Sequence, residues 1–314
     1  MAMVRFACSR FILPALPLLL AACATTPPIQ FKDVVEPQAV SIEPLRSDKP
    51  IVALALGSGG ARGFAHIGVI KALEANDIHI DIVVGTSAGS VVGALYAGGY
   101  KGDEIERIAL DLDESRLKDV DISKRGYIRG EQLQDFINRE LNNRSIEKLD
   151  KPFIAVATQL DTGNQVGFNR GNTGKAVRAS SSIPGVYYPV QIGEHEYVDG
   201  DLKSPVPVSA ARAMGADIVI AVDISQQPQD QPYQQDIIDI LKQSLRIMRQ
   251  SVLAQQIESA QIVIRPDIGK TPEINADNKL RLIKNGEDAA LAMMPQIREW
   301  MNKITTQKKS MKSR

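Results

Sequence analysis

Short runs of consecutive apolar residues alternate with segments of helical periodicity along most of the chain. Residues 51–56, 153–158 and 217–223 are apolar runs with the length of strands that are buried on both faces of a parallel sheet. Strands that alternate with helices predict an α/β fold, in which helices cover both faces of a mainly parallel sheet. The intervening apolar positions with helical spacing predict helices at residues 64–75, 103–112, 130–141, 173–182 and 206–214.

The chain divides after Ser225, where a linker rich in Gln, Pro and Asp covers residues 226–235. Before the linker, a short strand at 165–168 and a hairpin at 190–198 complete a principal domain at 51–225. After the linker we predict a long helical stretch, a short strand and a final amphipathic helix. Residues 226–314 are therefore predicted to form a mainly helical C-terminal extension.

The first 22 residues have a different character from the rest. Two arginines precede an apolar run that ends in small residues, and the two prolines and short length of this run indicate a secretory signal peptide at residues 1–22 rather than a transmembrane helix. Leu20-Ala21-Ala22-Cys23 resembles the lipobox of bacterial lipoproteins, in which the cysteine is acylated and becomes the mature amino terminus. The alternative is an unlipidated signal peptide with an incidental cysteine.

Residues 23–50 are predicted to be the lipidated Cys23 and a Pro-rich tether. Ala24 follows the cysteine where an aspartate would favour retention in the inner membrane. We therefore expect an outer-membrane lipoprotein in the cell envelope that faces the periplasm, and a membrane association through the lipid anchor.

Charge and cysteine content exclude some classes of protein. The 314 residues include 37 basic and 37 acidic side chains, and this zero net charge gives no indication of a nucleic-acid partner. Cys8 would be lost with the signal peptide and Cys23 would carry lipid. No thiol would remain for a disulfide, so the core alone would stabilise the domain.

The candidate chemistry begins at a serine between a predicted strand and a predicted helix. A β-branched run at residues 80–84 leads into Gly85-Thr86-Ser87-Ala88-Gly89, and a small-residue apolar helix follows. In this setting a G-x-S-x-G motif forms a sharp turn that presents the serine hydroxyl, and Gly85 and Gly89 permit the close backbone approach. The alternative is that these small residues only permit tight packing.

A glycine-rich turn, Gly57-Ser58-Gly59-Gly60-Ala61-Arg62-Gly63, lies between the first predicted strand and helix. Its glycine spacing does not fit a dinucleotide-binding fingerprint, and no acidic residue ends the second strand. The turn suits an oxyanion hole better, because the backbone amides of Gly59, Gly60 and Ala61 can bind a developing negative charge. Arg62 adds positive charge.

The residues alone leave two candidates for the base. One is a triad of Ser87, Asp161 and His195, although His195 has the sequence setting of a hairpin tip. The other is Asp199, at the end of a predicted strand and followed by Gly200, which permits close approach to Ser87. An aspartate has an ordinary pKa of about 3.9, so the site would have to desolvate it. His66 is expected to pack or to bind the backbone.

Three segments together resemble the patatin-like phospholipase family. They are the glycine-rich loop with Arg62-Gly63, the elbow around Ser87, and Asp199-Gly200-Asp201, and the likeness extends over residues 51–225. The resemblance implies a three-layer α/β/α hydrolase whose catalytic residues are Ser87 and Asp199. It implies no metal and no cofactor. The substrate would be a lipid ester, and the sequence identifies no protein partner.

Two positions depart from the family's pattern. Ser58 replaces a glycine, and we expect a mild effect because the amide donors lie on the following residues. Asp201 replaces a small residue, and a second carboxylate would raise the pKa of Asp199, either improving it as a base or leaving it protonated. The hypothesis is thus a membrane-anchored serine esterase acting on phospholipids or lysophospholipids. The alternative is a lipid-anchored binding or scaffold protein that has kept a hydrolase fold.

Overall fold

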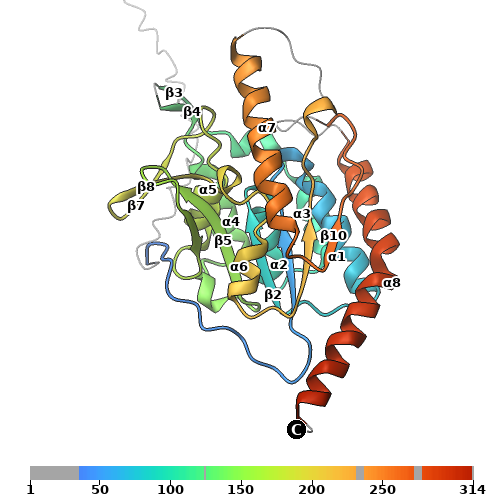
Figure 1. Cartoon of the computed structure of the whole chain (residues 1–314). Helices are drawn as coiled ribbons and strands as arrows, with labels where there is room; N and C mark the ends of the chain where they lie inside the picture. Colours follow the sequence, from blue (N-terminus) through green and yellow to red (C-terminus); the bar gives the residue numbers. More distant parts are fainter. Residues whose placement is uncertain (1–34, 124, 231–236, 272–277, 313–314) are drawn as a thin grey trace, which may run out of the picture. The chain divides into compact units, whose positions relative to one another are not determined.

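A mixed β-sheet forms the centre of the structure, a computed structural model that describes residues 35–123, 125–230, 237–271 and 278–312 (Figure 1). Within these residues the sheet has eight strands. Seven follow the order β10-β9-β1-β2-β5-β8-β7, in which β2 and β8 pair with successive parts of one edge of β5, and the eighth strand, β6, pairs with the other edge of β5. The strands are β1 (Val52–Leu56), β2 (Ile82–Thr86), β5 (Phe153–Gln159), β6 (Gln165–Phe168), β7 (Val190–Ile192), β8 (His195–Asp199), β9 (Ile218–Val222) and β10 (Ile262–Ile264).

The middle of the sheet is parallel and its outer part is antiparallel. Parallel pairing joins β10, β9, β1, β2 and β5, whereas β6 and β8 run antiparallel to β5, and β7 runs antiparallel to β8. Buried parallel strands have no solvent face, which explains why they read as continuous apolar runs in the sequence.

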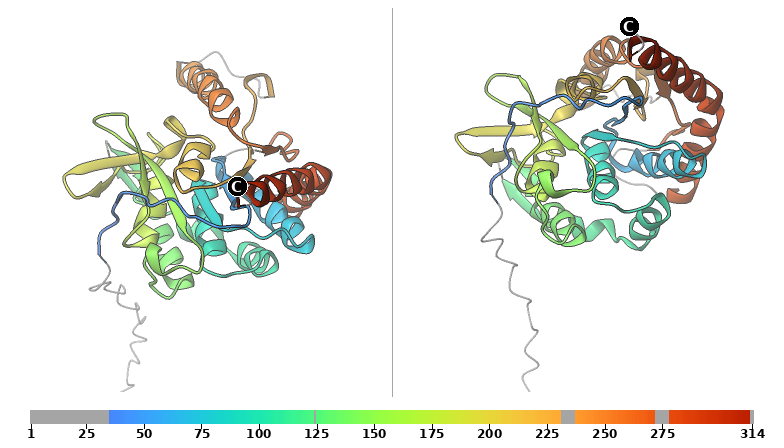
Figure 2. Two further views of the ribbon diagram at one scale, coloured as in Figure 1. Left: turned by 60° about the horizontal axis from the view of Figure 1, so that its bottom comes forward. Right: turned by 90° about the horizontal axis from the view of Figure 1, so that it is seen from below.

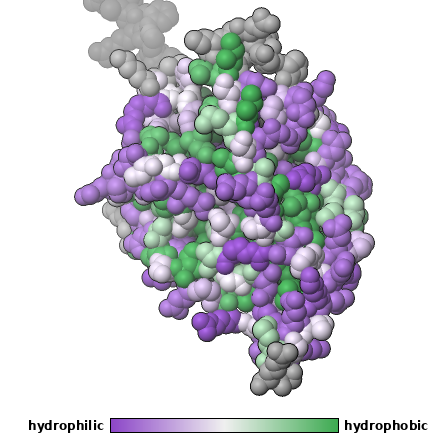
Figure 3. Space-filling model, viewed as in Figure 1, coloured by the Kyte–Doolittle hydropathy of each residue, from purple (hydrophilic) through white to green (hydrophobic). Residues whose placement is uncertain are grey.

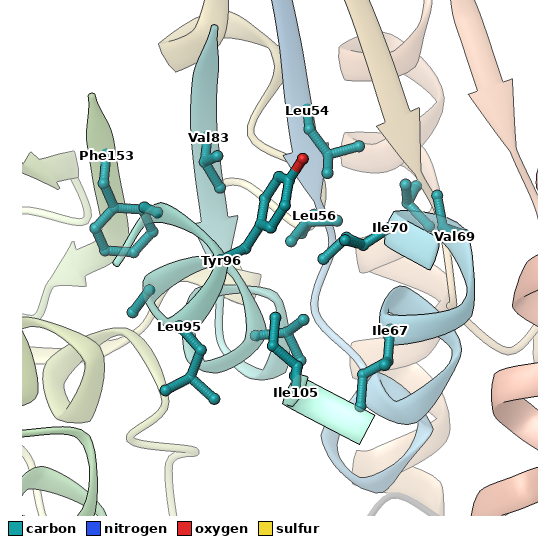
Figure 4. Close-up of a cluster of buried hydrophobic side chains, with 14 of the residues drawn as sticks. Leu54, Leu56, Ile67, Val69, Ile70, Val83, Leu95, Tyr96, Ile105 and Phe153 are labelled. Carbon is teal, nitrogen blue, oxygen red and sulfur yellow. The ribbon is translucent and has the colours of Figure 1, made fainter. Parts of the chain in front are cut away.

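Helices cover both faces of this sheet. Leu54 and Leu56 of β1 pack with α1, α2 and α3 on one face, which Figure 4 shows in close-up. Ala53 and Ala55 point to the other face, where α6 and the end of α7 contribute buried side chains. The expected three-layer α/β/α fold is confirmed. The helices are α1 (Phe64–Ala75), α2 (Ala88–Ala97), α3 (Gly102–Asp111), α4 (Glu131–Glu140), α5 (Thr173–Ser180), α6 (Val208–Ala213), α7 (Ile237–Ile257) and α8 (Lys279–Lys312).

The C-terminal extension is part of the same compact unit, which begins at Asp33. Its strand β10 extends the central sheet beside β9, and α8 packs along α1 (Figures 1 and 2). Two glycines allow this helix pair to approach closely. A Cβ atom added to Gly68 would lie 1.8 Å from the Ile283 carbonyl oxygen, and one added to Gly286 would lie 2.0 Å from the Ala65 carbonyl oxygen.

One pair of strands was absent from the prediction. Val120–Ser123 (β3) and Gly126–Ile128 (β4) form a separate antiparallel hairpin. The side chains of Val120 and Tyr127 in this hairpin are exposed. Ile128 is buried, but strands of four and three residues are too short for an alternating pattern to be recognised in a sequence.

Residues 35–50 contain no helix or named strand, as expected for the Pro-rich segment, but they are attached to the domain. Gln38 and Arg170 form an antiparallel bridge, the Leu45 amide donates to the Met214 carbonyl over 2.8 Å, and Glu36 pairs with Lys175. This part of the predicted tether thus follows the domain surface, as the blue segment in Figure 2 shows. The predicted signal peptide, Cys23 and the start of the tether lie outside the described residues. No helix in the described ranges has the length and apolar content needed to span a membrane.

Candidate active site

Ser87 occupies a strained turn between β2 and α2. Its backbone angles are φ 53° and ψ −125°, a region that residues with a side chain seldom adopt. The flanking glycines make room for the turn: a Cβ atom at Gly85 would lie 2.4 Å from the Gly89 carbonyl oxygen, and one at Gly89 would lie 2.1 Å from the Leu56 carbonyl oxygen. The sequence motif therefore has the sharp elbow geometry that it predicts.

The register of the sheet brings Asp199 to Ser87. On one edge of β5, Thr86 of β2 lies opposite Val156, and Asp199 of β8 lies opposite the next residue, Ala157. The Ser87 hydroxyl donates to Asp199 Oδ2 over 2.6 Å, and both side chains are buried, with 4% and 2% of their residues' surface exposed. This is the distance over which a carboxylate can accept a hydroxyl proton.

Gly200 permits this approach. A Cβ atom at this position would lie 2.2 Å from the Val156 carbonyl oxygen and 2.9 Å from the Thr86 side chain. Any side chain would thus push the Asp199 loop away from β5. Gly200 is therefore required for the close packing on β5 that brings Asp199 to Ser87.

Ser180, at the end of α5, holds the elbow in place. The Ser87 amide donates to Ser180 Oγ over 2.9 Å, and the Ser180 hydroxyl donates to the Val156 carbonyl over 2.6 Å. Ser180 is fully buried. One hydroxyl therefore ties the strained turn to β5, a role that the sequence motifs did not reveal.

Asp199 is a carboxyl group with a strongly perturbed pKa. Burial is the main cause and the nearby Asp201 charge the second, and together they raise the pKa of Asp199 to about 8, against smaller lowering effects from the Ser87 hydrogen bond, the Asp201 amide and Arg249. The Asp201 amide donates to Asp199 Oδ1 over 2.8 Å, so the second carboxylate oxygen is also bonded. A carboxyl group with this pKa is a far stronger base than an aspartate in water.

The negative charge of Asp201, next to Asp199, is compensated by a positive one. Arg249 of α7 forms an ion pair with it, with 2.7 Å between Nε and Oδ1, and the Ser58 hydroxyl is bonded to the same carboxylate. Arg249 also donates to Ser58 Oγ over 2.6 Å. The two departures from the family's pattern, Ser58 and Asp201, thus contact each other directly and share one arginine. Arg249 lies in the C-terminal extension, where no sequence motif marked it.

The glycine-rich loop ends in a 3-10 turn, Gly60–Gly63, beside Ser87. Within the described residues, the amides of Gly59, Gly60 and Ala61 donate no backbone hydrogen bond, so these donors remain for a ligand. Gly60 has φ 56°, which favours glycine. The Arg62 side chain is buried and its Nε donates to the Gly59 carbonyl over 2.8 Å, so the arginine braces the loop.

An apolar cavity of about 220 Å³ opens beside Ser87. Gly60 and Ala61 of the glycine-rich loop line it together with Ser87, and the remaining wall comes mainly from aliphatic and aromatic side chains of α1, α2, α3 and α4. A mainly apolar cavity that is lined in part by the serine suits a hydrocarbon chain whose carbonyl lies at Ser87. The lining includes Phe64, Val91, Leu95, Ile105, Leu133 and Phe136.

Comparison with known proteins fits this geometry. The model of the patatin-like phospholipase family matches residues 54–212, about half of the 314-residue chain. The chain belongs to the patatin-like phospholipase family. The matched residues include the glycine-rich loop, the Ser87 elbow and Asp199, which are the three parts of the site described above.

Two curated relatives share the patatin-like region. An uncharacterized NTE family protein of Mycobacterium tuberculosis is 42% identical over 182 residues, which cover 57% of this chain and 50% of the relative. Human patatin-like phospholipase domain-containing protein 6 is 34% identical over 184 residues, which cover 56% of this chain and 13% of that protein. The chain thus spans half or less of the length of these relatives.

A solved structure shares the patatin-like fold. VipD from Legionella pneumophila superposes with a TM-score of 0.56 at 14% identity, and the match covers 83% of this chain and 70% of VipD. The coverage extends beyond the 54–212 region, so the fold likeness includes part of the structure outside the family match.

The triad candidates lie away from the serine of the patatin-like domain. His195 Nδ1 is 3.2 Å from Asp161 Oδ2, but both side chains are about half exposed at the hairpin end. His195 begins β8 and Asp199 ends it, a separation of about 13 Å along a strand. The structure therefore brings Ser87 together with Asp199, while Asp161 and His195 form a surface pair.

The second histidine of interest, His66, is fully buried in α1. Its Nε2 donates to the Gly57 carbonyl over 2.7 Å, which fastens the start of the glycine-rich loop to the helix. Burial lowers the pKa of His66 to about 4. The residue thus has the backbone-bonding role that the sequence predicts, as a neutral imidazole.

Proposed function

We propose that the protein is a serine esterase that hydrolyses carboxylic esters of phospholipids or lysophospholipids through an acyl-enzyme on Ser87. The observation that carries this proposal is the 2.6 Å hydrogen bond from Ser87 Oγ to Asp199 Oδ2 at a buried elbow. The apolar cavity at the same serine supports a fatty-acyl ester as the substrate. Membership of the patatin-like family supports the same activity.

In the acylation step, Ser87 Oγ bonds to the ester carbonyl carbon while its proton passes to ionised Asp199. The carbonyl electron pair moves to oxygen, and the amides of Gly59, Gly60 and Ala61 stabilise that negative charge. The intermediate then collapses and breaks the bond to the alcohol oxygen, which takes the proton from Asp199. The alcohol leaves, and the acyl group stays on Ser87.

Deacylation repeats these steps with water. Asp199 accepts a proton from the water as its oxygen bonds to the acyl carbon, and the same loop amides bind the second oxyanion. Collapse breaks the bond to Ser87 Oγ, which takes the proton back. The products are a free fatty acid and the original serine.

Hydrolysis of a short-chain nitrophenyl ester tests this mechanism. Ser87→Ala and Asp199→Asn should each reduce turnover to the background rate, because one removes the nucleophile and the other removes the base. His195→Ala and Asp161→Asn are the matched controls and should keep full activity. Full activity in either dyad variant would disprove the dyad, and loss of activity in His195→Ala would favour the triad.

A non-catalytic scaffold is the second candidate function, and Asp201 is the observation that favours it. A second carboxylate that kept Asp199 protonated would leave a folded but inactive site. The Arg249 ion pair opposes this effect. A fluorophosphonate probe distinguishes the two functions, because covalent labelling of Ser87 requires an activated hydroxyl. A folded wild-type protein that the probe leaves unlabelled would support the scaffold.

We also propose that Cys23 anchors the protein to the outer membrane, facing the periplasm. The support is the signal-like segment at residues 1–22 and its lipobox-like end. Metabolic labelling with a radioactive fatty acid should mark the wild-type protein and not Cys23→Ser. Fractionation of the cell envelope should place the labelled protein with outer-membrane markers, and recovery with inner-membrane markers would contradict this location.

A further inference from the structure

Helix α7 has an unusual distribution of apolar and polar side chains in its first three turns. A helix on the surface of a globular protein normally turns its apolar side chains inward and its polar ones to solvent. Among the described side chains between Ile240 and Gln250, those that face the protein are polar and the large apolar ones are exposed. The exposed fractions are 48% for Ile240, 60% for Leu241, 55% for Leu245, 54% for Ile247 and 65% for Met248.

Hydrogen bonds on the inner side fix this orientation. Gln243 Nε2 donates to the Pro228 carbonyl over 3.0 Å, and the Gln250 amide bonds to the Gln227 side chain. Arg249 holds Ser58 and Asp201, as described above. These contacts leave the helix no freedom to turn its apolar side inward without breaking the link to the candidate active site.

The exposed residues form a continuous face. Leu241, Leu245 and Met248 have the spacing that places side chains in one row along a helix, and Ile240 and Ile247 lie along one side of that row. Figure 3 shows hydrophobic side chains gathered along the upper part of α7, where Figure 1 places this helix. One turn later the pattern becomes ordinary, and Leu253 is buried in the core. Among the described side chains, the exposed apolar face therefore ends before Leu253.

The chemistry of this segment suits a lipid surface. Arg249 is paired with Asp201 on the inner side, and the residues between Asp239 and Arg249 contain two further basic residues, Lys242 and Arg246, and no acidic residue. Apolar side chains combined with basic ones are the pattern of helices that lie at a membrane interface and bind anionic headgroups. The same helix reaches Ser58 at the edge of the oxyanion loop through Arg249, so a surface bound by this face would lie next to the candidate active site.

We propose that the α7 face formed by Ile240, Leu241, Leu245, Ile247 and Met248 docks the protein on a lipid bilayer that contains anionic headgroups. The choice of a lipid surface rests on the proposed esterase function, because a buried serine beside an apolar cavity must obtain its acyl chain from such a surface. Docking through α7 acts in addition to the Cys23 anchor. It would set the orientation of the candidate active site on the bilayer.

Vesicle co-sedimentation tests the proposal on residues 24–314, which contain the whole compact unit that begins at Asp33 and lack the lipidated cysteine. The vesicles contain equal parts of phosphatidylcholine and phosphatidylglycerol. A triple variant, Leu241→Gln, Leu245→Gln and Met248→Gln, should bind them at least about tenfold more weakly. The control carries Leu280→Gln, Leu291→Gln and Met311→Gln, which remove three exposed apolar side chains from α8, and it should bind like the parent protein.

The outcomes separate this proposal from the esterase function. Turnover of a soluble nitrophenyl ester should be equal in the parent and the triple variant, because no altered side chain touches the site. Parent protein that does not bind the vesicles, or a triple variant that binds like the α8 control, would overturn the lipid-docking proposal. Loss of self-association in the triple variant with unchanged vesicle binding would assign the face to a second copy of the chain. A parent protein that binds vesicles through α7 but hydrolyses no ester would retain docking and refute the esterase.

Discussion

Arg249 Nε lies 2.7 Å from Asp201 Oδ1, and this ion pair connects α7 to the loop that carries Asp199. Asp201 raises the pKa of Asp199 and Arg249 lowers it. The arginine therefore opposes the effect that a second acidic residue has on the proposed base. Because Arg249 is only 11% exposed and Asp201 is 31% exposed at their side chains, solvent screens the pair incompletely.

The first prediction concerns the acid limb of the pH–activity profile. Asp199 must be ionised to accept a proton, so kcat/KM should rise with pH through the pKa of Asp199, which is about 8. Asp201→Asn removes a negative charge and should move this limb to lower pH. Arg249→Gln removes the opposing positive charge and should move it to higher pH.

Nitrophenyl ester hydrolysis across the pH range measures both shifts. Arg249→Lys is the matched control, since it keeps a positive charge and should leave the limb closer to the wild-type position than Arg249→Gln does. Shifts of the same sign in Asp201→Asn and Arg249→Gln would contradict the electrostatic explanation. A loss of stability alone would change the amount of active protein and not the position of the limb.

Ser180 is predicted to position Ser87. Ser180→Ala removes the acceptor of the Ser87 amide and the donor to the Val156 carbonyl, and we expect the free energy of unfolding to fall by about 1–3 kcal/mol. The strained elbow should also lose its fixed geometry, which lowers kcat by roughly tenfold with KM nearly unchanged. Ser180→Thr keeps the hydroxyl and should restore kcat. Equal kcat values in wild type and Ser180→Ala would limit Ser180 to a role in folding.

Sequence patterns predicted the fold well because its strands are buried on both faces. The apolar runs that became β1, β2, β5 and β9 are unambiguous, since a parallel sheet between two helical layers leaves no polar alternation along its strands. The β3–β4 hairpin, in contrast, was not predicted. Its strands have four and three residues, which is too short for a periodic signal, so the sequence did not distinguish it from a loop.

The site was predictable where short motifs specify backbone geometry. Gly85, Gly89 and Gly200 stand where a Cβ atom would collide with backbone, so their positions in the sequence report the elbow and the approach of Asp199. Arg249 is different, because its contact with Asp201 spans 48 positions along the chain and depends on how α7 lies on the domain. A long-range side-chain contact of this kind leaves no local pattern.

Val91 gives a test of the acyl-chain cavity. It lies one helical turn after Ser87 and lines the cavity, and it is half-buried. Val91→Trp should obstruct a long chain, so kcat/KM for a decanoyl ester should fall at least about tenfold more than for an acetyl ester. Leu110→Trp adds the same bulk at an exposed position outside the cavity lining and should change neither value. An equal loss on both esters would place the acyl chain elsewhere.

His66 should make the fold sensitive to acid. Its pKa is lowered to about 4 in the folded state and is about 6.5 when unfolded, so the unfolded chain binds a proton first as the pH falls. The contribution of His66 to stability is complete above the unfolded pKa and is lost as the pH falls toward the folded pKa. Between about pH 7 and pH 5 the contribution of His66 to the free energy of unfolding should fall by about 2 kcal/mol.

A comparison with His66→Gln isolates this effect, because glutamine can donate to the Gly57 carbonyl and does not titrate. The comparison is necessary because the raised pKa of Asp199 acts in the opposite direction, stabilising the fold as the pH falls toward its unfolded pKa. Urea unfolding at both pH values should show wild type losing about 2 kcal/mol more than His66→Gln. Equal losses in the two proteins would mean that the pKa of His66 is not lowered in the native state.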